Sequence, residues 1–219
     1  MPYRRTENVV RRLAEREEAI LAAATAIAGE GGMAAVQIAS VAARAGIAAG
    51  TIYRYLPSKA DLVAELVAAV AGRELSAMRQ AADAAPGPLS ALAAAIATFA
   101  ARALNERRLA WAVIGEPVDA RVDAMRLDFR QSLAAELETR IKTAIAGGHL
   151  PEQEAGVAAP AIVGALMEGL LGPLAAEPGD AAAARAAVQT ATLLALRALG
   201  VVDARARGLV AQCVLPVKI

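Results

Sequence analysis

Aromatic residues, cysteine and histidine are scarce in this chain, and each scarcity argues against a class of function. Of 219 residues, 3% are aromatic, one is a cysteine and one is a histidine. The single Cys213 excludes a disulfide within the chain and has no partner for a cysteine metal motif. The lone His149 stands in a Gly-Gly-His-Leu-Pro stretch, with no second group for acid–base, nucleophilic or metal chemistry. We therefore expect no enzyme, no cofactor and no metal site.

Long hydrophobic runs are also lacking, although 57% of the residues are hydrophobic. A membrane-spanning helix needs about 20 apolar residues. The longest stretch without charge is 84–101, and Pro86-Gly87-Pro88 near its start leaves a helical part too short to span a bilayer. The basic N-terminus is not followed by the apolar segment of a signal peptide. We expect a cytoplasmic protein with no membrane partner, whose apolar residues are buried in a core, an oligomer interface or a ligand site.

Alanine dominates the composition, and it is the best helix former. Because alternating β-branched residues are scarce, the sequence predicts an all-α fold, with about nine helices between glycine and proline breaks. The charge is uneven: residues 1–59 carry eight Lys and Arg against five Asp and Glu, a net of +3, whereas residues 60–219 carry 15 against 17, a net of −2. A positive N-terminal part suits a nucleic-acid partner.

The segment 36–62, VQIASVAARAGIAAGTIYRYLPSKADL, begins with the pattern of a helix and a tight turn. Ile38, Val41 and Ala45 recur at spacings of three and four, which is typical of an amphipathic helix. Gly46 follows at the position where a left-handed C-terminal cap favours glycine. The first helix is therefore expected to end at Ala45.

A second short helix follows within residues 48–55, with Ile52 and Leu56 on the face toward the first helix. Pro57 closes it, because the residue before a proline is disfavoured in the α region. The stretch Ser-Lys-Ala-Asp from Ser58 then predicts a capping box that opens a third helix. Two helices joined by a glycine turn and followed by a capped helix form a helix-turn-helix, which binds the major groove of DNA.

The outward residues of this unit are the candidate DNA contacts. They are Gln37, Arg44, Ala48, Ala49, Thr51, Tyr53, Arg54, Tyr55 and Lys59. Lys59 stands at a helix N-terminus, where its side chain and free backbone amides suit phosphate. Since Ala48 and Ala49 offer only methyl contacts, Arg54 and Thr51 are the preferred base readers. The alternative is that Tyr53 and Tyr55 pack on the core and that Lys59 is a solvated residue.

Residues 15–62 resemble the N-terminal domain of TetR-family transcriptional regulators. The matching positions are Val41-Ala42, Ala45-Gly46-Ile47, Gly50-Thr51-Ile52-Tyr53, Tyr55, and Ser58-Lys59 with Leu62. Family members usually carry a serine where this chain has Ala48, and loss of such a helix cap costs about 1 kcal/mol. Val36 and Gln37 replace the usual hydroxyl residues at the start of the preceding helix, so that phosphate contact is left to Gln37 or is absent.

We expect two domains. Residues 1–62 form the three-helix DNA-binding domain with a basic N-terminal arm, and residues 63–219 form a larger helical effector-binding and dimerisation domain. The arm, with Arg4, Arg5, Arg11 and Arg12, is either a disordered solvated tail or a DNA contact. Helices are expected at about 58–84, 89–105, 109–114, 120–146, 152–171 and 180–199, and no role is assigned to residues 201–219.

The last two long helices, 152–171 and 180–199, are apolar on more than one face, and such helices have to be buried on all sides. We expect a homodimer through these helices, which the resemblance also implies; the alternative is a monomer with an unusually apolar bundle. A two-fold dimer reads two half-sites about one helical turn apart. The residues expected to need a partner are Ala158, Ile162, Ala165, Met167, Leu170, Val188, Thr192, Leu193 and Leu196.

Seven residues are candidates for a ligand site. They are Phe99, Trp111, Glu116, Met125, Phe129, Met167 and Glu168, with Asp119, Arg121 and Gln131 as further polar candidates. Their helices surround the effector pocket in similar proteins, and such pockets are mostly apolar with a few polar groups. Glu168 interrupts an apolar helix, so its carboxylate needs a partner, water or a ligand. For each aromatic, the alternative is plain core packing.

The sequence thus suggests a ligand-responsive transcriptional regulator, most simply a repressor that binds a palindromic operator as a dimer and is released by a small lipophilic effector. An effector that prefers the form with misplaced recognition helices lowers operator affinity by a population shift. The helix beginning at Ser58 is the suggested lever, because it belongs to both domains. A constitutive architectural DNA-binding protein without effector and a helical protein-interaction bundle remain alternatives.

Overall fold

The structure, a computed structural model, describes residues 7–116 and 120–215, and the regular structure of these residues is entirely helical, which confirms the all-α prediction. Within the described residues there are ten α-helices and one 3-10 turn, rather than about nine helices. They are α1 (Glu7–Gly31), η1 (Met33–Ala35), α2 (Ile38–Arg44), α3 (Ala49–Ile52), α4 (Lys59–Asp83), α5 (Pro88–Asn105), α6 (Arg107–Ile114), α7 (Ala120–Ala146), α8 (Ala155–Leu170), α9 (Ala181–Ala198) and α10 (Asp203–Gln212).

Helix α1 occupies most of the segment for which a disordered tail was one expectation. That expectation does not hold from Glu7 onward, and Arg4 and Arg5 lie outside the described residues. Ile20, Ala24 and Ile27 are buried on one side of the helix at spacings of three and four. The turns of α1 before Ile20 carry charged residues on several sides. The apolar spacing therefore begins too late along the chain to predict where the helix starts.

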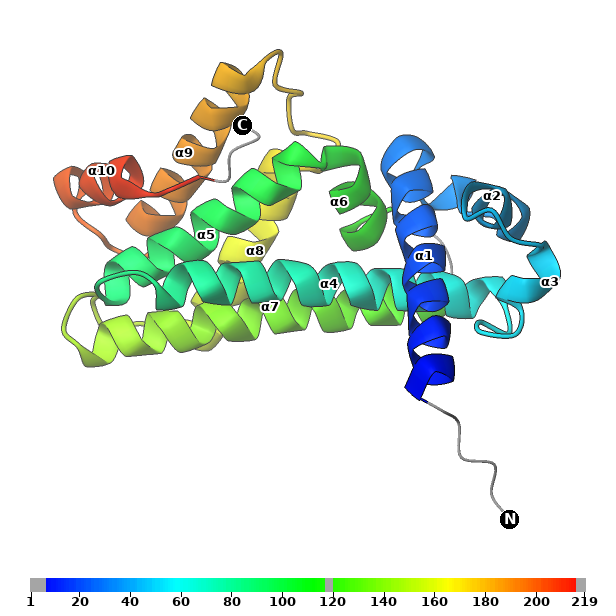
Figure 1. Cartoon of the computed structure of the whole chain (residues 1–219). Helices are drawn as coiled ribbons and strands as arrows, with labels where there is room; N and C mark the ends of the chain where they lie inside the picture. The colour runs from blue at the N-terminus through cyan, green and yellow to red at the C-terminus, as the bar shows by residue number, and fades with distance from the viewer. Residues whose placement is uncertain (1–6, 117–119, 216–219) are drawn as a thin grey trace.

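Helix α4 connects the α1–α3 cluster to the rest of the molecule. It begins beside α3, crosses α1 and then lies alongside α7 for much of its length (Figure 1). Its apolar stripe faces the core as predicted, with Leu62, Leu66, Val70 and Met78 all buried. Since one uninterrupted helix contacts both parts, a tilt of α4 has to move the α1–α3 cluster relative to the bundle.

Helix α5 is the central helix of the bundle, and it packs against α4, α7, α8, α9 and α10. Among the residues that the structure describes, it is the one helix long and apolar enough to cross a membrane, contrary to the expectation that this stretch is too short. However, 67% of it is buried inside the fold, as in the core helix of a bundle. The apolar character of α5 is therefore accounted for by protein packing.

Helices α8 and α9 bury within one chain several residues that were expected to need a partner. Ile162, Leu170, Val188, Thr192 and Leu196 are all buried within one chain and need no partner, whereas Ala165 of the same predicted set is exposed. Small and apolar residues nevertheless remain exposed on the opposite sides. They are Val157, Pro160, Ala161, Gly164 and Ala165 on α8, and Ala183, Ala186, Thr190 and Leu194 on α9.

Candidate DNA-binding surface and effector cavity

The turn of the helix-turn-helix has the predicted geometry. α2 ends at Arg44, Ala45 is its C-cap, and Gly46 adopts a positive φ of 67°. The amide of Ile47 donates to the carbonyl of Ala42 at 3.0 Å, which closes the turn. A left-handed residue is needed here, and glycine adopts that conformation without the steric cost of a Cβ.

The second and third helices of the unit begin differently. α3 spans four residues, and its N-cap Ala48, with φ −71° and ψ 144°, supplies no side-chain hydrogen bond. Ser58 caps α4, because its hydroxyl accepts from the amide of Asp61 at 3.1 Å and donates to the carboxylate of Asp61 at 2.7 Å. The predicted difference between the uncapped recognition helix and the capped helix after it is confirmed.

The same carboxylate connects the unit to α7. Arg121 Nη2 lies 2.7 Å from Asp61 Oδ1, so α7 holds the first turn of α4. The hydrogen bond from Ser58, and then the bond and charge of Arg121, lower the pKa of Asp61. This carboxylate is therefore held in its ionised form where the start of α4 meets α7.

Most of the candidate DNA contacts point outward. Gln37, Arg44, Ala48, Ala49, Tyr53, Arg54 and Lys59 are exposed, whereas Thr51 and Tyr55 are partly buried. Tyr55 packs against the core, as its alternative interpretation held, but 52% of Tyr53 is exposed. Ile52 and Leu56 are buried beneath them, as predicted, so the recognition helix is anchored on one face and open on the other.

Two of the outward polar residues already have partners. Arg44 forms two hydrogen bonds to Glu30, at 2.6 and 2.7 Å, and this interaction lowers the pKa of the Glu30 carboxyl. Gln37 donates from Nε2 to the carbonyl of Ala34 at 2.9 Å. Arg44 is therefore already held by a carboxylate on α1, whereas Arg54 is exposed on the turn after α3. Glu30 is a neighbour that sequence spacing alone did not reveal.

A narrow cavity lies between α4, α5, α6 and α7. Phe99 and Phe129 line it, together with Leu109, Val113 and Ile114 of α6. Its volume is about 30 Å³, whereas sites for small organic ligands usually measure about 300–1,000 Å³. The cavity therefore has to widen before such a ligand can enter.

The polar lining of this cavity consists of residues that the sequence did not single out. Glu74 of α4 and Arg102 of α5 pair across it, with Arg102 Nε 2.6 Å from Glu74 Oε2 and Arg102 Nη2 2.9 Å from Glu74 Oε1. Glu106 also lines the cavity. These residues lie 28 or more positions from Glu74 in the chain, and only the packing of α4 on α5 brings them together.

The other ligand candidates lie elsewhere. Trp111 lines a groove near the start of α9, and Met125 is partly buried against the core. Met167, Glu168 and Gln131 line a groove of about 430 Å³ on the outer side of α7 and α8. Glu168 is exposed there, so its carboxylate needs no buried partner.

The remaining polar candidates contact η1 or the start of α4, or fall outside the described residues. Glu116 accepts from the amide of Met33 at 3.3 Å and pairs with Arg108 at 3.1 Å. Arg121 pairs with Asp61, as described above. Asp119 lies outside the described residues. Of the seven ligand candidates, Phe99 and Phe129 are therefore the two that share the narrow cavity.

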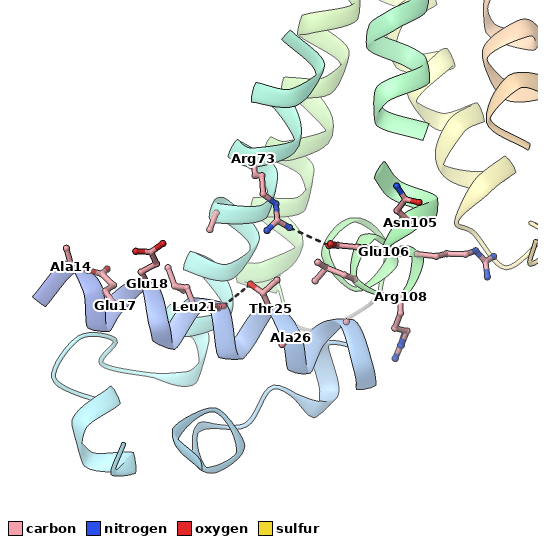
Figure 2. Close-up of a pocket in the computed structure, with 15 residues that line it drawn as sticks. Ala14, Glu17, Glu18, Leu21, Thr25, Ala26, Arg73, Asn105, Glu106 and Arg108 are labelled. Carbon is pink, nitrogen blue, oxygen red and sulfur yellow. Dashed lines mark hydrogen bonds and ion pairs between the residues drawn. The ribbon is translucent and has the colours of Figure 1, made fainter. Parts of the chain in front are cut away.

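A wider groove separates α1 from the α5–α6 junction. Figure 2 shows α1 along one side, Arg73 reaching from α4, and Glu106 and Arg108 on the other side. The groove has a volume of about 950 Å³, and Leu21 contributes to its apolar lining. Across its rim, Arg73 Nη2 lies 3.7 Å from Glu106 Oε2. The two walls of the groove, residues 14–29 of α1 and residues 105–109, are about 80 positions apart in the chain, so no local sequence pattern could indicate the groove.

Comparison with known proteins places the helix-turn-helix in a defined family. The model of bacterial regulatory proteins of the tetR family matches residues 20–66. The HTH-type transcriptional repressor KstR of Mycobacterium tuberculosis is 55% identical over 62 residues, which are 28% of this chain and 26% of KstR. KstR of Rhodococcus jostii is 50% identical over 54 residues, or 25% of this chain and 26% of that protein. The chain thus matches about a quarter of the length of these curated relatives.

Solved structures match nearly the whole chain. RolR in complex with resorcinol has a TM-score of 0.66 at 19% identity, over 94% of this chain and 98% of RolR. FadR of Bacillus subtilis in complex with stearoyl-CoA has a TM-score of 0.67 at 17% identity, over 84% of this chain and 98% of FadR. At such identities the likeness establishes the fold alone. The sequence match shows that residues 20–66 of this chain belong to the tetR family of bacterial regulatory proteins, and the chain as a whole shares the fold of RolR and FadR.

Proposed function

We propose that the protein is a ligand-responsive transcriptional repressor, located in the cytoplasm, that binds a palindromic operator as a homodimer. The observation that carries this proposal is the open face of α3 and of the turn that follows it: Tyr53 and Arg54 of this turn are exposed beside the buried Ile52, within the segment 20–66 that matches the tetR family model. We keep the division at residue 62, with α4 running through both domains.

The DNA contacts divide by chemistry. Arg54 and Thr51 are the proposed base readers, because a guanidinium and a hydroxyl recognise base edges in the major groove. Tyr53 and Lys59 are the proposed phosphate contacts, since both lie at the exposed side of the unit and Lys59 opens a helix. Ala48 and Ala49 contribute methyl contacts, and Gln37, Arg44 and Tyr55 have supporting roles.

The exposed sides of α8 and α9 support the homodimer. Positions 183, 186, 190 and 194 form one stripe along α9, and the adjacent α8 exposes small residues that allow two helices to approach closely. Packing of this surface on its symmetry copy would remove the exposed Val157 and Leu194 from water. The resulting four-helix interface would relate two recognition helices by a two-fold axis.

The narrow cavity is the proposed effector site. Its Phe99 and Phe129 favour a small lipophilic ligand, and the Glu74–Arg102 pair offers the polar groups that orient one. RolR and FadR bind ligands as different as resorcinol and stearoyl-CoA on the same fold, so the fold does not fix the size of the ligand. The other five ligand candidates belong to this site only if the helices rearrange when the ligand enters. They are Trp111, Glu116, Met125, Met167 and Glu168.

A selection of duplexes from a random DNA library by the full-length protein tests the proposal. We expect a palindrome, and light scattering of the protein should give twice the mass of one chain. Arg54→Ala should relax the preference at one position of each half-site, whereas the control Arg207→Ala, in an exposed pair on α10, should leave it unchanged. Selected duplexes without a common sequence would contradict operator binding.

A constitutive DNA-binding protein is the second candidate, and the small volume of the cavity favours it. A thermal-shift screen with phenols, fatty acids and acyl-CoAs separates the two candidates. A compound that raises Tm and also weakens binding to the selected palindrome supports the ligand-responsive repressor. If no compound changes Tm, the constitutive protein is the better description.

A further inference from the structure

The first turn of α6 carries two successive arginines that hold opposite parts of the molecule. Arg108 is directed toward the end of α1, and Arg107 is directed toward the segment between α8 and α9. Both donate to backbone carbonyls near the C-terminus of a helix, where unpaired carbonyl groups and the helix dipole favour a cation. α6 is therefore a bridge between the DNA-binding helices and the far side of the bundle.

On one side, Arg108 near the start of α6 and Glu116 just after its end both contact the turn between α1 and η1. Arg108 Nη2 donates to the carbonyl of Gly31 at 3.1 Å, and Arg108 Nη1 donates to Glu116 Oε2, also at 3.1 Å. The same Glu116 oxygen accepts from the amide of Met33 at 3.3 Å. An exposed ion pair alone contributes little. Here it also binds a backbone carbonyl and a backbone amide, which fixes its orientation.

The backbone of the turn between α1 and η1 leaves room for the Arg108–Glu116 pair. Gly32 adopts a positive φ of 76°, and a Cβ at this residue would collide with the Arg108 guanidinium and lie 2.7 Å from Glu116 Oε2. The absence of a side chain lets both charged groups lie directly over the backbone. Three features therefore coincide at this place: the left-handed Gly32, the Gly31 carbonyl at the end of α1 and the Arg108–Glu116 charge pair.

On the other side, Arg107 organises the connection between α8 and α9. Its Nε donates to the carbonyl of Leu170, the last residue of α8, at 3.1 Å, and its Nη2 donates to the carbonyl of Ala175 at 3.1 Å. Its Nη1 lies 2.7 Å from Glu177. A displacement of α6 relative to this segment is thus transmitted directly to Arg108, the next residue along the chain.

An open groove lies beside the contact between α1 and α6. It has a volume of about 950 Å³ and runs between α1 and the α5–α6 junction, with Arg108 on its border (Figure 2). α1 also packs directly on α6, where Gly29 lies against the buried Leu109. The polar contacts at Gly31 and Met33 therefore act together with this packing in setting the position of the DNA-binding helices.

We propose that Arg108 and Glu116 form a latch that holds the DNA-binding helices in the operator-competent position, and that Arg107 couples this latch to the α8–α9 segment. The inference rests on the proposed operator binding and adds the contact that regulates it. A ligand that displaces α6 opens the latch, so α6 works beside α4 as a second connection between the domains. Arg108, Glu116 and Arg107 act as positioning residues, because they hold the DNA-binding helices and do not contact DNA.

The first test measures the latch without DNA. Hydrogen–deuterium exchange of the amides at 31–36 is compared in the full-length protein, Arg108→Ala, Glu116→Ala and the conservative Glu116→Gln, which keeps an acceptor for Met33. We expect both alanine variants to exchange faster at Met33, Glu116→Gln to lie between them and the wild type, and the control Arg207→Ala to match the wild type. Unchanged exchange at Met33 in both alanine variants would overturn the latch.

The second test measures the consequence for operator binding, with the palindrome selected by the wild type. We expect Arg108→Ala and Glu116→Ala each to weaken binding to the palindrome by about 5- to 20-fold, with the double variant no weaker than either. Binding to a duplex with a single half-site should not change, because α3 itself is intact. Equal losses on both duplexes, or no loss, would overturn the regulatory role.

The two tests separate the inference from the function on which it rests. If the wild type selects no operator, the proposed function fails, whereas the exchange measurement still reports whether the latch is closed. If the wild type selects an operator and the exchange at Met33 is unaffected by Arg108→Ala and Glu116→Ala, the latch alone fails. Arg107→Ala completes the series: faster exchange at 171–177 together with faster exchange at Met33 supports the coupling through α6, and a change confined to 171–177 contradicts it.

Discussion

Replacement of Ala48 by serine should stabilise the start of the recognition helix. Ala48 has the extended backbone of an N-cap and is exposed, so a serine hydroxyl fits without a clash and can accept from the first free amides of α3. A serine at such a position contributes about 1 kcal/mol relative to alanine. This corresponds to about a fivefold lower population of the opened helix. The effect is large for α3 because the helix has only four residues.

Ser58→Ala is the matched control, since Ser58 caps the next helix with both a donor and an acceptor contact to Asp61. It should cost about 1 kcal/mol or slightly more, because the Asp61 amide and carboxylate both lose a partner. Hydrogen exchange of residues 49–56 and 59–63 measures the two local effects in the absence of DNA. If each opening is part of global unfolding, Tm should rise by about 2–4 °C for Ala48→Ser and fall by a similar amount for Ser58→Ala.

The result that would refute this reasoning is specific. If Ser58→Ala accelerates exchange at the start of α4, while Ala48→Ser leaves exchange at 49–56 unchanged, the missing cap does not limit α3. The packing of Ile52 and Leu56 would then determine its stability. Operator affinity is measured afterwards on the same variant, because a hydroxyl at position 48 can also contact DNA.

Three further predictions follow from the bundle and the helix junctions. Phe99→Ala should destabilise the protein by about 3–5 kcal/mol, because the residue is 5% exposed. Chemical denaturation measures this change, and a loss below about 1 kcal/mol would show that the side chain is not packed. Ala161→Arg, on the exposed side of α8, should give particles of single-chain mass in light scattering, and an unchanged dimer would place the interface elsewhere. The pKa of Asp61 is lowered in the folded protein, so its contribution to stability is present above the ordinary Asp range and is lost as the pH falls through the lowered value. Asp61→Asn should therefore flatten the fall in stability below about pH 4. An identical pH profile of stability in the variant and the wild type would contradict that contribution.

Local patterns predicted the helix-turn-helix because its geometry depends on near neighbours. Gly46 ends α2 and Ser58 opens α4 through hydrogen bonds that span three to five positions, and such contacts can be predicted from residue spacing. The end of α7 at Ala146 was predicted for the same reason, because a double glycine follows it. α10 was not predicted, because it is short and has a single fully buried residue, Ala206.

The site could not be predicted to the same extent because its contacts join distant segments. Glu116 was singled out as a ligand group, yet its partner Met33 lies 83 residues away, and no periodicity points to that contact. Glu168 attracted attention as a charge in an apolar helix, but the side of α8 on which it lies depends on how α8 packs on α7. The Glu74–Arg102 pair was missed because each residue looked like an ordinary charge on a helix surface.

The four-residue recognition helix also limits how much information a subunit can extract from DNA. A fully recognised base pair supplies about two bits, since four arrangements are distinguishable in the major groove. Thr51 and Arg54, repeated in the second subunit of the proposed dimer, would supply about eight bits, whereas selection of one site among about a million competitors requires about 20. For the proposed operator, most of the remainder has to come from sequence-dependent shape and bending of the duplex. The base sequence at the centre of the operator, which neither subunit touches, should then vary as little among bound sites as the base pairs that the arginines read.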